Sequence, residues 1–403
     1  MKTSRFLDRT TPPHIATLIL LAGLSALAMN IFLPSLPGMA AYFGAPYSLM
    51  QLSVALYLAL SAVLQVIIGP VSDRFGRRRV LLVSLVLFLI ATAGTLLAQT
   101  ATTFLIFRMA QAVIAAGMVL SRAVVRDMVP DAQAASMIGY VTMGMSIVPM
   151  IGPVVGGVLD EAFGWHANFG LLLILGAATL ALTWADLGET ATIRRVSLAD
   201  QMRSYPTLLK SQRFWGYVLC ASFTAGTFYA YLGGAPYVGN VVFGLTSSHI
   251  GLLFAITAIG YAAGNFVAGR YSVRLGLNRM ILLGSLLTMA GLGLLLVLTF
   301  AGIHSALVFF GCTLFVGAGN GMTLPNANAG MLSVRPELAG TASGLGGAIQ
   351  IGGGAAIAAL AGALLGPGSD EMPLVLLMLA CATASLFAIY WVMRRARAIG
   401  LSA

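Results

Sequence analysis

Hydrophobic residues in this 403-residue chain form long runs, which are separated by short polar or glycine- and proline-rich breaks. Because a helix needs about 20 apolar residues to cross the hydrocarbon core of a bilayer, each run of that length predicts one membrane-spanning helix. Twelve such spans are predicted. They cover residues 15–33, 52–69, 80–98, 104–125, 137–159, 168–187, 215–238, 250–268, 280–301, 306–325, 341–365 and 373–392.

The same pattern divides the chain into two halves. The longest polar stretch between predicted helices covers residues 188–213, and this linker separates an N-terminal six-helix bundle (1–187) from a C-terminal one (214–403). The segment GPVSDRFGRRR at 69–79 has a fainter copy, GRYSVRLGLNR, at 269–279, and the two share five of eleven positions. This repeat predicts an all-α membrane protein built from two pseudo-symmetric six-helix bundles.

Composition and charge favour the same class of fold. With 59% hydrophobic and 8% charged residues, the chain cannot present the surface of a soluble protein. The net charge of +10 does not indicate a nucleic-acid partner, because twenty of the 22 basic residues lie at the termini or in connections that follow even-numbered spans. The positive-inside rule predicts that both termini are cytoplasmic. The first span, which follows Lys2, Arg5 and Arg9, is predicted to be a retained helix rather than a signal peptide.

No catalytic or metal-binding pattern is recognisable in the sequence. The four histidines lie at or near helix ends without paired metal-ligand spacing, and the three cysteines lie within apolar spans. The segment GAGNG at 317–321 lacks the lysine of a phosphate-binding loop. We therefore expect a non-enzymatic protein with no metal and no cofactor.

Several short motifs resemble those of the major facilitator superfamily. Its loop signature is matched by Gly69, Asp73, Arg74, Gly76, Arg77 and Arg78, and its fourth-helix signature by Arg108, Gln111 and Gly117, although Ala112 replaces the usual glycine. The set Gly152, Pro153, Gly156 and Gly157 resembles the fifth-helix signature of its drug-exporting antiporters. Within the superfamily, NIFLPSLP at 30–37, the Arg126, Asp127 pair and GTAS at 340–343 resemble the bicyclomycin and chloramphenicol exporters, the Bcr/CflA subfamily.

This resemblance implies a secondary active transporter, a monomeric multi-pass protein of the bacterial inner membrane that exports small amphipathic drugs, antibiotics among them. Such transporters bind substrate between their halves and expose it alternately to the two sides by rocking. The implied energy source is the proton gradient, used by antiport. Two alternatives stay open: a uniporter or importer of a small metabolite, and a membrane sensor that does not transport.

The resemblance also implies a conformational gate. In the superfamily, the acidic residue that matches Asp73 bridges to the start of the eleventh helix, whose partial positive charge favours a carboxylate. It also bridges to a basic residue that ends the fourth helix, here Arg126, and so closes the cytoplasmic side. Glycines in the fifth helix let backbones approach and bend. The expected gate residues are Gly69, Asp73, Arg74, Gly76, Arg77, Arg126, Gly152, Pro153, Gly156 and Gly157.

Two arginines lie inside the fourth span, where a charge is costly and marks a functional site. Arg108 lies about 8 Å from the extracytoplasmic end of the span, at about 1.5 Å per residue. We expect it to act in substrate binding or proton coupling, and the alternative is a structural arginine bonded to carbonyls. Arg122 lies close enough to the cytoplasm for its side chain to reach it.

A titratable carboxylate is missing from the middle of the spans, although a proton antiporter normally needs one there. Every Asp and Glu lies at a helix end or in a connection. The subfamily often has Asp at the position of Asn30, and asparagine cannot titrate. An engineered Asp-to-Asn change, a natural variant that couples through another group, and a uniporter all stay open. In each case we expect Asn30 to line the central cavity.

Further cavity residues are expected among polar and aromatic side chains of the spans that line the cavity in the superfamily. An unpaired polar group costs energy in hydrocarbon, and aromatic or methionine side chains suit varied apolar ligands. Besides Asn30 and Arg108, the candidates are Tyr57, Gln111, Met143, Phe228, Tyr231, Tyr261, Asn265, Asn320, Asn326 and Gln350.

Overall fold

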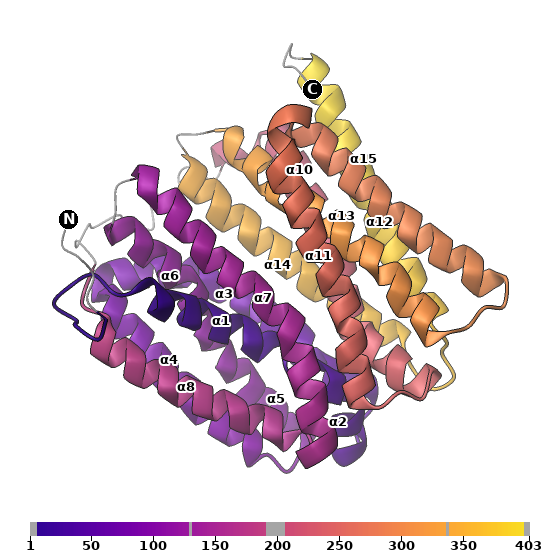
Figure 1. Ribbon diagram of the computed structural model, residues 1–403, viewed down its shortest axis with the longest axis horizontal. Helices are drawn as coiled ribbons and strands as arrows, with labels where there is room; N and C mark the ends of the chain where they lie inside the picture. Colours follow the sequence, from indigo (N-terminus) through magenta and orange to yellow (C-terminus); the bar gives the residue numbers. More distant parts are fainter. Residues whose placement is uncertain (1–5, 129–130, 191–205, 336–337, 399–403) are drawn as a thin grey trace.

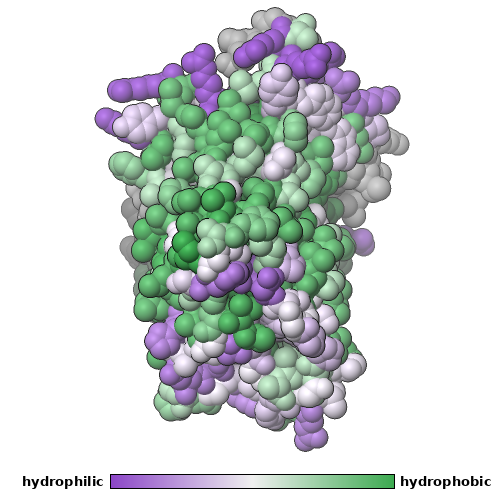
Figure 2. Space-filling model, turned by 90° about the vertical axis from the view of Figure 1, so that its right-hand side faces the viewer, coloured by the Kyte–Doolittle hydropathy of each residue, from purple (hydrophilic) through white to green (hydrophobic). Residues whose placement is uncertain are grey.

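The computed structural model describes residues 6–128, 131–190, 206–335 and 338–398. All regular secondary structure in these ranges is helical, and the helices pack side by side in one bundle (Figure 1). Within the same ranges, ten helices are long and apolar enough to cross a membrane. Figure 2 shows an apolar band across the middle of one face, with hydrophilic residues gathered mainly towards the ends. The predicted all-α membrane fold is confirmed.

The N-terminal half starts with a broken helix. Its elements are α1 (Ile15–Asn30), the 3-10 turn η1 (Leu33–Ser35), α2 (Leu36–Tyr42), α3 (Tyr47–Phe75), α4 (Arg77–Leu96), α5 (Ala101–Ala110), the 3-10 turn η2 (Gln111–Ile114), α6 (Ala115–Met128), α7 (Asp131–Phe163) and α8 (His166–Asp186). Pro34 and Pro37 each occupy one of the first two positions of a new turn, where proline costs no helical hydrogen bond. Helical structure therefore continues to Tyr42, and the first predicted span is too short.

The C-terminal half repeats this arrangement. Its elements are α10 (Gln212–Tyr237), the π-helical turn η3 (Val238–Val242), α11 (Ser247–Leu275), α12 (Leu277–Phe300), α13 (Ala306–Ser333), α14 (Ala339–Leu364) and α15 (Met372–Ala398). Each of the twelve predicted spans coincides with one of the helices or broken helices of the two halves. Residues 191–205 of the predicted linker lie outside the described ranges, and the domain boundaries stay a prediction.

The repeated loop has nearly the same backbone in both halves. Gly76, between α3 and α4, has φ 93° and ψ 143°, and Gly276, between α11 and α12, has φ 85° and ψ 154°. Each glycine N–H donates to the carbonyl of a serine four residues earlier, Ser72 or Ser272, at 2.9 Å. Only glycine adopts this conformation readily. The sequence repeat therefore specifies one sharp helix-to-helix turn that the fold uses twice.

The two ends of the bundle differ in charge. We call the end where α3 meets α4 and α11 meets α12 the basic end, because its connections carry arginines 74, 77–79, 126, 270, 274, 279 and 335. The opposite end, which carries Asp160, Glu161, Asp370 and Glu371, is called the acidic end. This separation is the charge asymmetry from which the membrane orientation is predicted.

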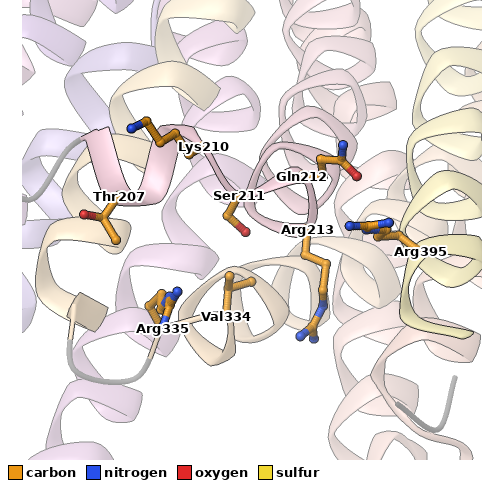
Figure 3. Close-up of a pocket in the computed structure, with 8 residues that line it drawn as sticks. All are labelled: Thr207, Lys210, Ser211, Gln212, Arg213, Val334, Arg335 and Arg395. Atoms are coloured by element: carbon orange, nitrogen blue, oxygen red, sulfur yellow. The ribbon is translucent and has the colours of Figure 1, made fainter. Parts of the chain in front are cut away.

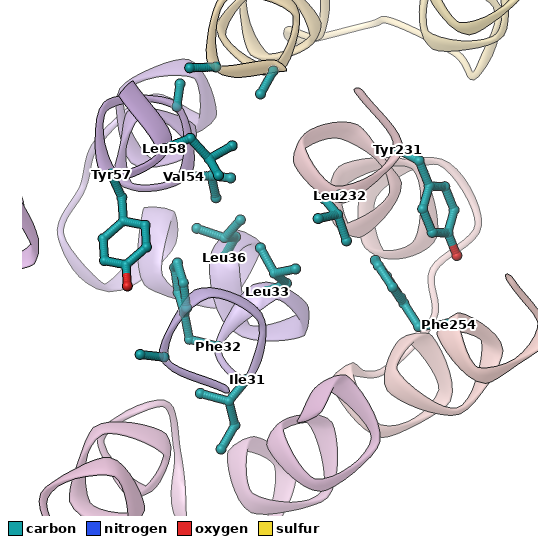
Figure 4. Close-up of a cluster of buried hydrophobic side chains, with 14 of the residues drawn as sticks. Ile31, Phe32, Leu33, Leu36, Val54, Tyr57, Leu58, Tyr231, Leu232 and Phe254 are labelled. Atoms are coloured by element: carbon teal, nitrogen blue, oxygen red, sulfur yellow. The ribbon is translucent and has the colours of Figure 1, made fainter. Parts of the chain in front are cut away.

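The hydrophobic core is shared between the halves towards the acidic end. One buried cluster joins Leu33 and Leu36 of the N-terminal half to Leu232 of α10, and Figure 4 shows these side chains facing one another. A second cluster, which includes Leu208 of the linker together with Phe214, Tyr217 and Ile281, contains no described residue of the N-terminal half and lies towards the basic end. The halves are thus packed together near the acidic end, whereas the C-terminal half has a core of its own near the basic end.

Glycines of α7 bring its backbone close to both halves at the acidic end. A Cβ atom at Gly156 would overlap the carbonyl of Ile31, just after α1, and one at Gly157 would overlap the backbone of Ser247, at the start of α11. Gly251 of α11 packs in the same way against the carbonyl of Pro153. Small residues permit such close helix packing in membranes. The α7 helix is therefore held between α1 and α11, which lie beside it in Figure 1.

Candidate functional site

Arg108 is the centre of a buried polar cluster in the N-terminal half. Its side chain is 0% exposed, and its Nη1 donates to Oε1 of Gln111 at 2.9 Å. Its Nε donates to the carbonyl of Ser53 on α3 at 3.3 Å. Gln111 in turn donates from Nε2 to Oγ1 of Thr92 on α4 at 2.8 Å. Three helical segments therefore fix the position of the guanidinium group.

Two aromatic rings flank the same guanidinium. Its central carbon lies 4.0 Å from the ring centroid of Tyr57 and 4.4 Å from that of Phe32. Each such contact contributes about 0.5–2 kcal/mol. Among the described residues no carboxylate bonds to Arg108, and its Nη2 has no hydrogen-bond partner. The cluster therefore holds a positive charge within the bundle and keeps one donor unused, and it unites three of the predicted site residues.

Asn30 is the last residue of α1 and is also fully buried. Its Nδ2 donates to the carbonyl of Ala26 at 2.8 Å, and its Oδ1 has no partner among the described residues. A Cβ atom at Gly152 of α7 would lie 3.7 Å from the Cβ of Asn30. We expected Asn30 to line the central cavity, but in this conformation α7 covers it, because Gly152 has no side chain to keep the two helices apart.

Phe228 and Tyr231 form an aromatic wall on α10 in the C-terminal half. Their ring centroids lie 6.5 Å apart. Tyr231 is fully buried, 4.8 Å from the ring of Phe254 on α11 and 6.2 Å from that of Phe310 on α13. Figure 4 shows Tyr231 and Phe254 together on the C-terminal side of the cluster. Phe228 is only partly buried and is therefore the accessible member of this wall.

The polar candidates of the C-terminal half do not form a single cluster. Tyr261 and Asn265 lie one turn apart on α11, where Nδ2 of Asn265 donates to the carbonyl of Tyr261 at 2.8 Å. Asn265 also lines a pocket of about 290 Å³ together with Asn326 of α13. Asn320 of α13 is buried and Gln350 of α14 is partly buried, and neither bonds to another candidate among the described residues. The side chain of Met143 lies outside the described part.

Two side chains of α3 reach across to the C-terminal half at the acidic end. The hydroxyl of Tyr47 donates to the carbonyl of Gly233 at 2.6 Å, and Nε2 of Gln51 donates to the carbonyl of Ala358 at 2.5 Å. The amide of Gln51 fills the space left by Gly233 and Gly362, and a Cβ atom at Gly362 would lie 2.6 Å from its Oε1. Buried hydrogen bonds therefore join the halves here.

A second set of polar contacts joins the halves beside α7. Oγ of Ser247, at the start of α11, donates to the carbonyl of Pro34 at 3.2 Å. Glu161, beyond the end of the predicted fifth span, accepts hydrogen bonds from Ser248 and Thr246, and these bonds lower the pKa of its carboxyl group. The acidic end is thus closed by contacts on two sides, at α3 and at α7.

The predicted latch residue Asp73 is paired within its own half in this conformation. Its Oδ1 lies 2.5 Å from Nη2 of Arg77, because the turn at Gly76 brings these two residues together. Arg77 also pairs with Asp127 at 3.2 Å, and its backbone N–H donates to Glu189 at 2.7 Å. The expected bridge from Asp73 to Arg126 and to the start of α14 is not among the described contacts. The observed network joins the α3–α4 turn to α6 and to the segment that follows α8.

The other gate candidates near this loop make fewer contacts. A Cβ atom at Gly69 would meet nothing within 4 Å, so packing does not demand glycine at this position. Arg74 is exposed, with its guanidinium carbon 5.4 Å from the ring of Phe75, and Arg126 is exposed as well. Arg74 and Arg126 therefore add positive charge to the basic end, and the described structure shows no ion pair for either of them.

Sequence reasoning missed Tyr47 and Gln51 because the second predicted span starts at residue 52. Helix α3 begins five residues earlier, at Tyr47, so both side chains lie inside the bundle. The signal that could have found Gln51 is the rule that selected the other candidates, namely that an amide buried in an apolar setting needs a partner. Its glycine partners are distant in sequence and visible only in the fold.

Two similar helical halves that share a core at one end, with a buried cation among the helices of the first half, have the architecture of a membrane transporter built from structural repeats. The comparison with protein families agrees: residues 18–357 match the model described as "Major Facilitator Superfamily". The chain belongs to this superfamily, and it is a transporter rather than an enzyme.

Two of the relatives that match most of the chain are named for drug resistance. The chain is 31% identical over 331 residues to a "Chloramphenicol resistance protein" of Pseudomonas aeruginosa, covering 81% of this chain and 78% of that protein. It is 26% identical over 395 residues to a "Bicyclomycin resistance protein homolog" of Haemophilus influenzae, covering 96% and 98%. Among solved structures, a bacterial homolog of the human lysosomal transporter Spinster has a TM-score of 0.73 at 16% identity, covering 95% and 96%. The resemblance to the bicyclomycin and chloramphenicol exporters is confirmed.

Proposed function

We propose that this protein exports small amphipathic compounds, antibiotics among them, across the bacterial inner membrane by alternating access. Membership of the superfamily and the names of the relatives support drug efflux as the general activity. The observation that carries the proposal is the closure of the acidic end by Tyr47, Gln51 and Glu161, with separate packing of the C-terminal half towards the basic end.

The direction of opening follows from the charge pattern. The positive-inside rule assigns the basic end, and with it both termini, to the cytoplasm. The conformation is then closed to the outside and open to the cytoplasm, the state in which an exporter loads its substrate. In this state the latch at Asp73 is released, which agrees with its pairing to Arg77. Closure of the cytoplasmic side would move Asp73 towards the start of α14.

Substrate contacts are assigned to candidates on the inner helices of both halves. The partly buried side chains of Phe228, Tyr261, Asn265 and Gln350 offer aromatic and amide groups to a ligand. Arg108 lies deeper and is held without a carboxylate partner in the described structure. We propose that its positive charge acts in substrate binding or in proton coupling. A monomer suffices for this mechanism.

The proposed export is coupled to the proton gradient. Asn30 cannot titrate, so coupling through that position is absent, and any coupling must use another group. The test is transport of chloramphenicol by the protein reconstituted in liposomes, measured with and without an imposed pH gradient. Accumulation driven by the gradient supports antiport, whereas equal flux in both conditions supports the uniporter. A matched Asn30→Asp variant is expected to make transport more strongly gradient-dependent.

The same protein in liposomes also distinguishes drug export from a sensor and from a transporter of a small metabolite. Saturable binding of chloramphenicol without flux would support a sensor. Absence of both binding and flux for a panel of amphipathic antibiotics, with flux of a small metabolite instead, would overturn drug export. Growth of cells with and without the gene on the same antibiotics provides an independent check.

A further inference from the structure

A basic pocket lies in the C-terminal half at the basic end, at the ends of helices whose middle parts carry proposed transport residues. It has a volume of about 390 Å³ and is formed where the end of the linker, the start of α10, the α13–α14 connection and the end of α15 meet. Figure 3 shows its lining residues on these four segments.

The pocket is positively charged. Four of its eight described lining residues are Lys210, Arg213, Arg335 and Arg395, and none of these eight is acidic. Ser211 and Thr207 add hydroxyl groups, which can donate to an anion. Arginine and lysine together with hydroxyl donors are the groups that bind phosphate. The composition of the lining therefore fits a phosphate-bearing ligand.

Two local features strengthen this assignment. The pocket lies at the N-terminus of α10, a helix of 26 residues, where the helix dipole favours an anion. Nε of Arg213, the second residue of that helix, is buried and has no hydrogen-bond partner among the described residues. A buried donor without a partner is costly, and a bound anion would satisfy it.

The pocket also lies at the level of the bilayer surface. Trp391 and Tyr390, one turn before Arg395 on α15, are 40% and 62% exposed. Trp215, two residues after Arg213, donates from Nε1 to the carbonyl of Leu209 at 2.7 Å. Exposed Trp and Tyr side chains mark the boundary between hydrocarbon and water in membrane proteins. Lipid headgroups are therefore at the same height as the basic side chains.

We propose that this pocket binds the phosphate group of an anionic ligand, with an anionic phospholipid of the adjoining leaflet as the source. Binding would connect the end of the linker to α10 and α15 and so anchor this half at the membrane surface. The proposal does not depend on which compound the protein transports.

The test is native mass spectrometry of the full-length protein in detergent, titrated with phosphatidylglycerol or with phosphatidylcholine. The pocket variant is Lys210→Gln/Arg213→Gln/Arg395→Gln. A matched control, Arg270→Gln/Arg274→Gln/Arg279→Gln, removes the same charge from exposed positions at the same end of the bundle. A charge-conserving variant, Arg213→Lys/Arg395→Lys, shows whether altered packing alone changes binding.

We expect selective retention of phosphatidylglycerol by the unaltered protein and by the control. The pocket variant should bind it about 100-fold more weakly, since each basic residue near a headgroup contributes about fivefold. The charge-conserving variant should retain most of the binding. Competition by inorganic phosphate at millimolar concentration would support the same pocket with a free phosphate as its ligand.

Equal binding of the two lipids by the unaltered protein would overturn the proposal, and so would equal losses in the pocket variant and the control. Because the first of these readouts uses the unaltered protein, it stands even if the triple variant does not fold.

Discussion

The side-chain amide of Gln51 on α3 donates to the backbone carbonyl of Ala358 on α14, 307 positions later, at 2.5 Å. This bond crosses between the two halves and is fully buried. It forms because Gly233 and Gly362 leave space for the amide between α10 and α14. This bond can form only when the two halves are packed together at the acidic end.

Replacing Gln51 by alanine should weaken closure of the acidic end. A buried hydrogen bond contributes about 1 kcal/mol, which corresponds to about a fivefold shift in the open-to-closed ratio. Spin labels at the exposed positions Tyr42 and Val241 would measure the separation of the halves there. The partly buried Gln65, on the same helix but nearer the basic end, provides the control Gln65→Ala. An unchanged distance distribution in the Gln51→Ala variant would contradict this role.

Replacing Gly157 by alanine should separate α7 from α11. The added methyl group would overlap the backbone of Ser247, which cannot rotate away as a side chain can. We expect transport to fall about tenfold or more, because small displacements of packed helices are not absorbed continuously. Gly170→Ala on α8 is the matched control, since nothing lies within 4 Å of a Cβ atom there. Equal transport by the two variants would show that the close approach is not required.

Arg108→Gln should strongly reduce transport without a large loss of stability. Burial of a cation without a carboxylate partner costs several kcal/mol in desolvation free energy. The two ring contacts offset about 1–4 kcal/mol of this cost. Removing the charge therefore leaves Tm unchanged or raised, while substrate flux falls at least about tenfold. Thermal unfolding in detergent and chloramphenicol flux in liposomes measure the two effects, with Arg122→Gln as the control. A large fall in Tm with flux retained would identify Arg108 as a structural arginine.

Closure of the acidic end should weaken on strong acidification. Hydrogen bonds from Ser248 and Thr246 lower the pKa of Glu161 in the closed state, whereas an opened state leaves it near the ordinary value of about 4.3. The lowered pKa means that its contribution to closure is present above the ordinary value and is lost as pH falls through the lowered pKa. Distance measurements between the same spin labels across this pH range detect the opening. In Glu161→Gln the dependence should disappear, and a persistent pH response there would assign it to another group.

Alanine substitutions at the two loop glycines, Gly76 and Gly276, should lower the stability of the protein to different extents. Alanine at either Gly76 or Gly276 must adopt a positive φ, at a cost of about 1–3 kcal/mol. At Gly76 the new Cβ atom would also overlap the carboxylate of Glu189, whereas at Gly276 it would meet nothing within 4 Å. We therefore expect Gly76→Ala to lower Tm more than Gly276→Ala does. The reverse order would show that the contact with Glu189 does not stabilise the fold.

The sequence alone determined the class of this protein, because lipid imposes simple rules. Backbone groups in hydrocarbon must bond within a helix, so the length of each apolar run predicts a span. The confinement of basic residues in connections to one end of the bundle predicts an orientation, and the repeat around Gly76 and Gly276 predicts two similar halves that share one turn geometry. Each of these inferences rests on properties that are local along the chain.

The tertiary structure decided which side chains meet. The pairing of Arg108 with Gln111 follows from helical spacing, but its contact with Tyr57 depends on how α3 packs, and the burial of Asn30 depends on the approach of α7 at Gly152. The bond from Gln51 to Ala358 joins two helices of different halves, whose relative position no local pattern specifies. Close packing of glycines sets these distances, and it also decides that the acidic end is the closed one in this conformation.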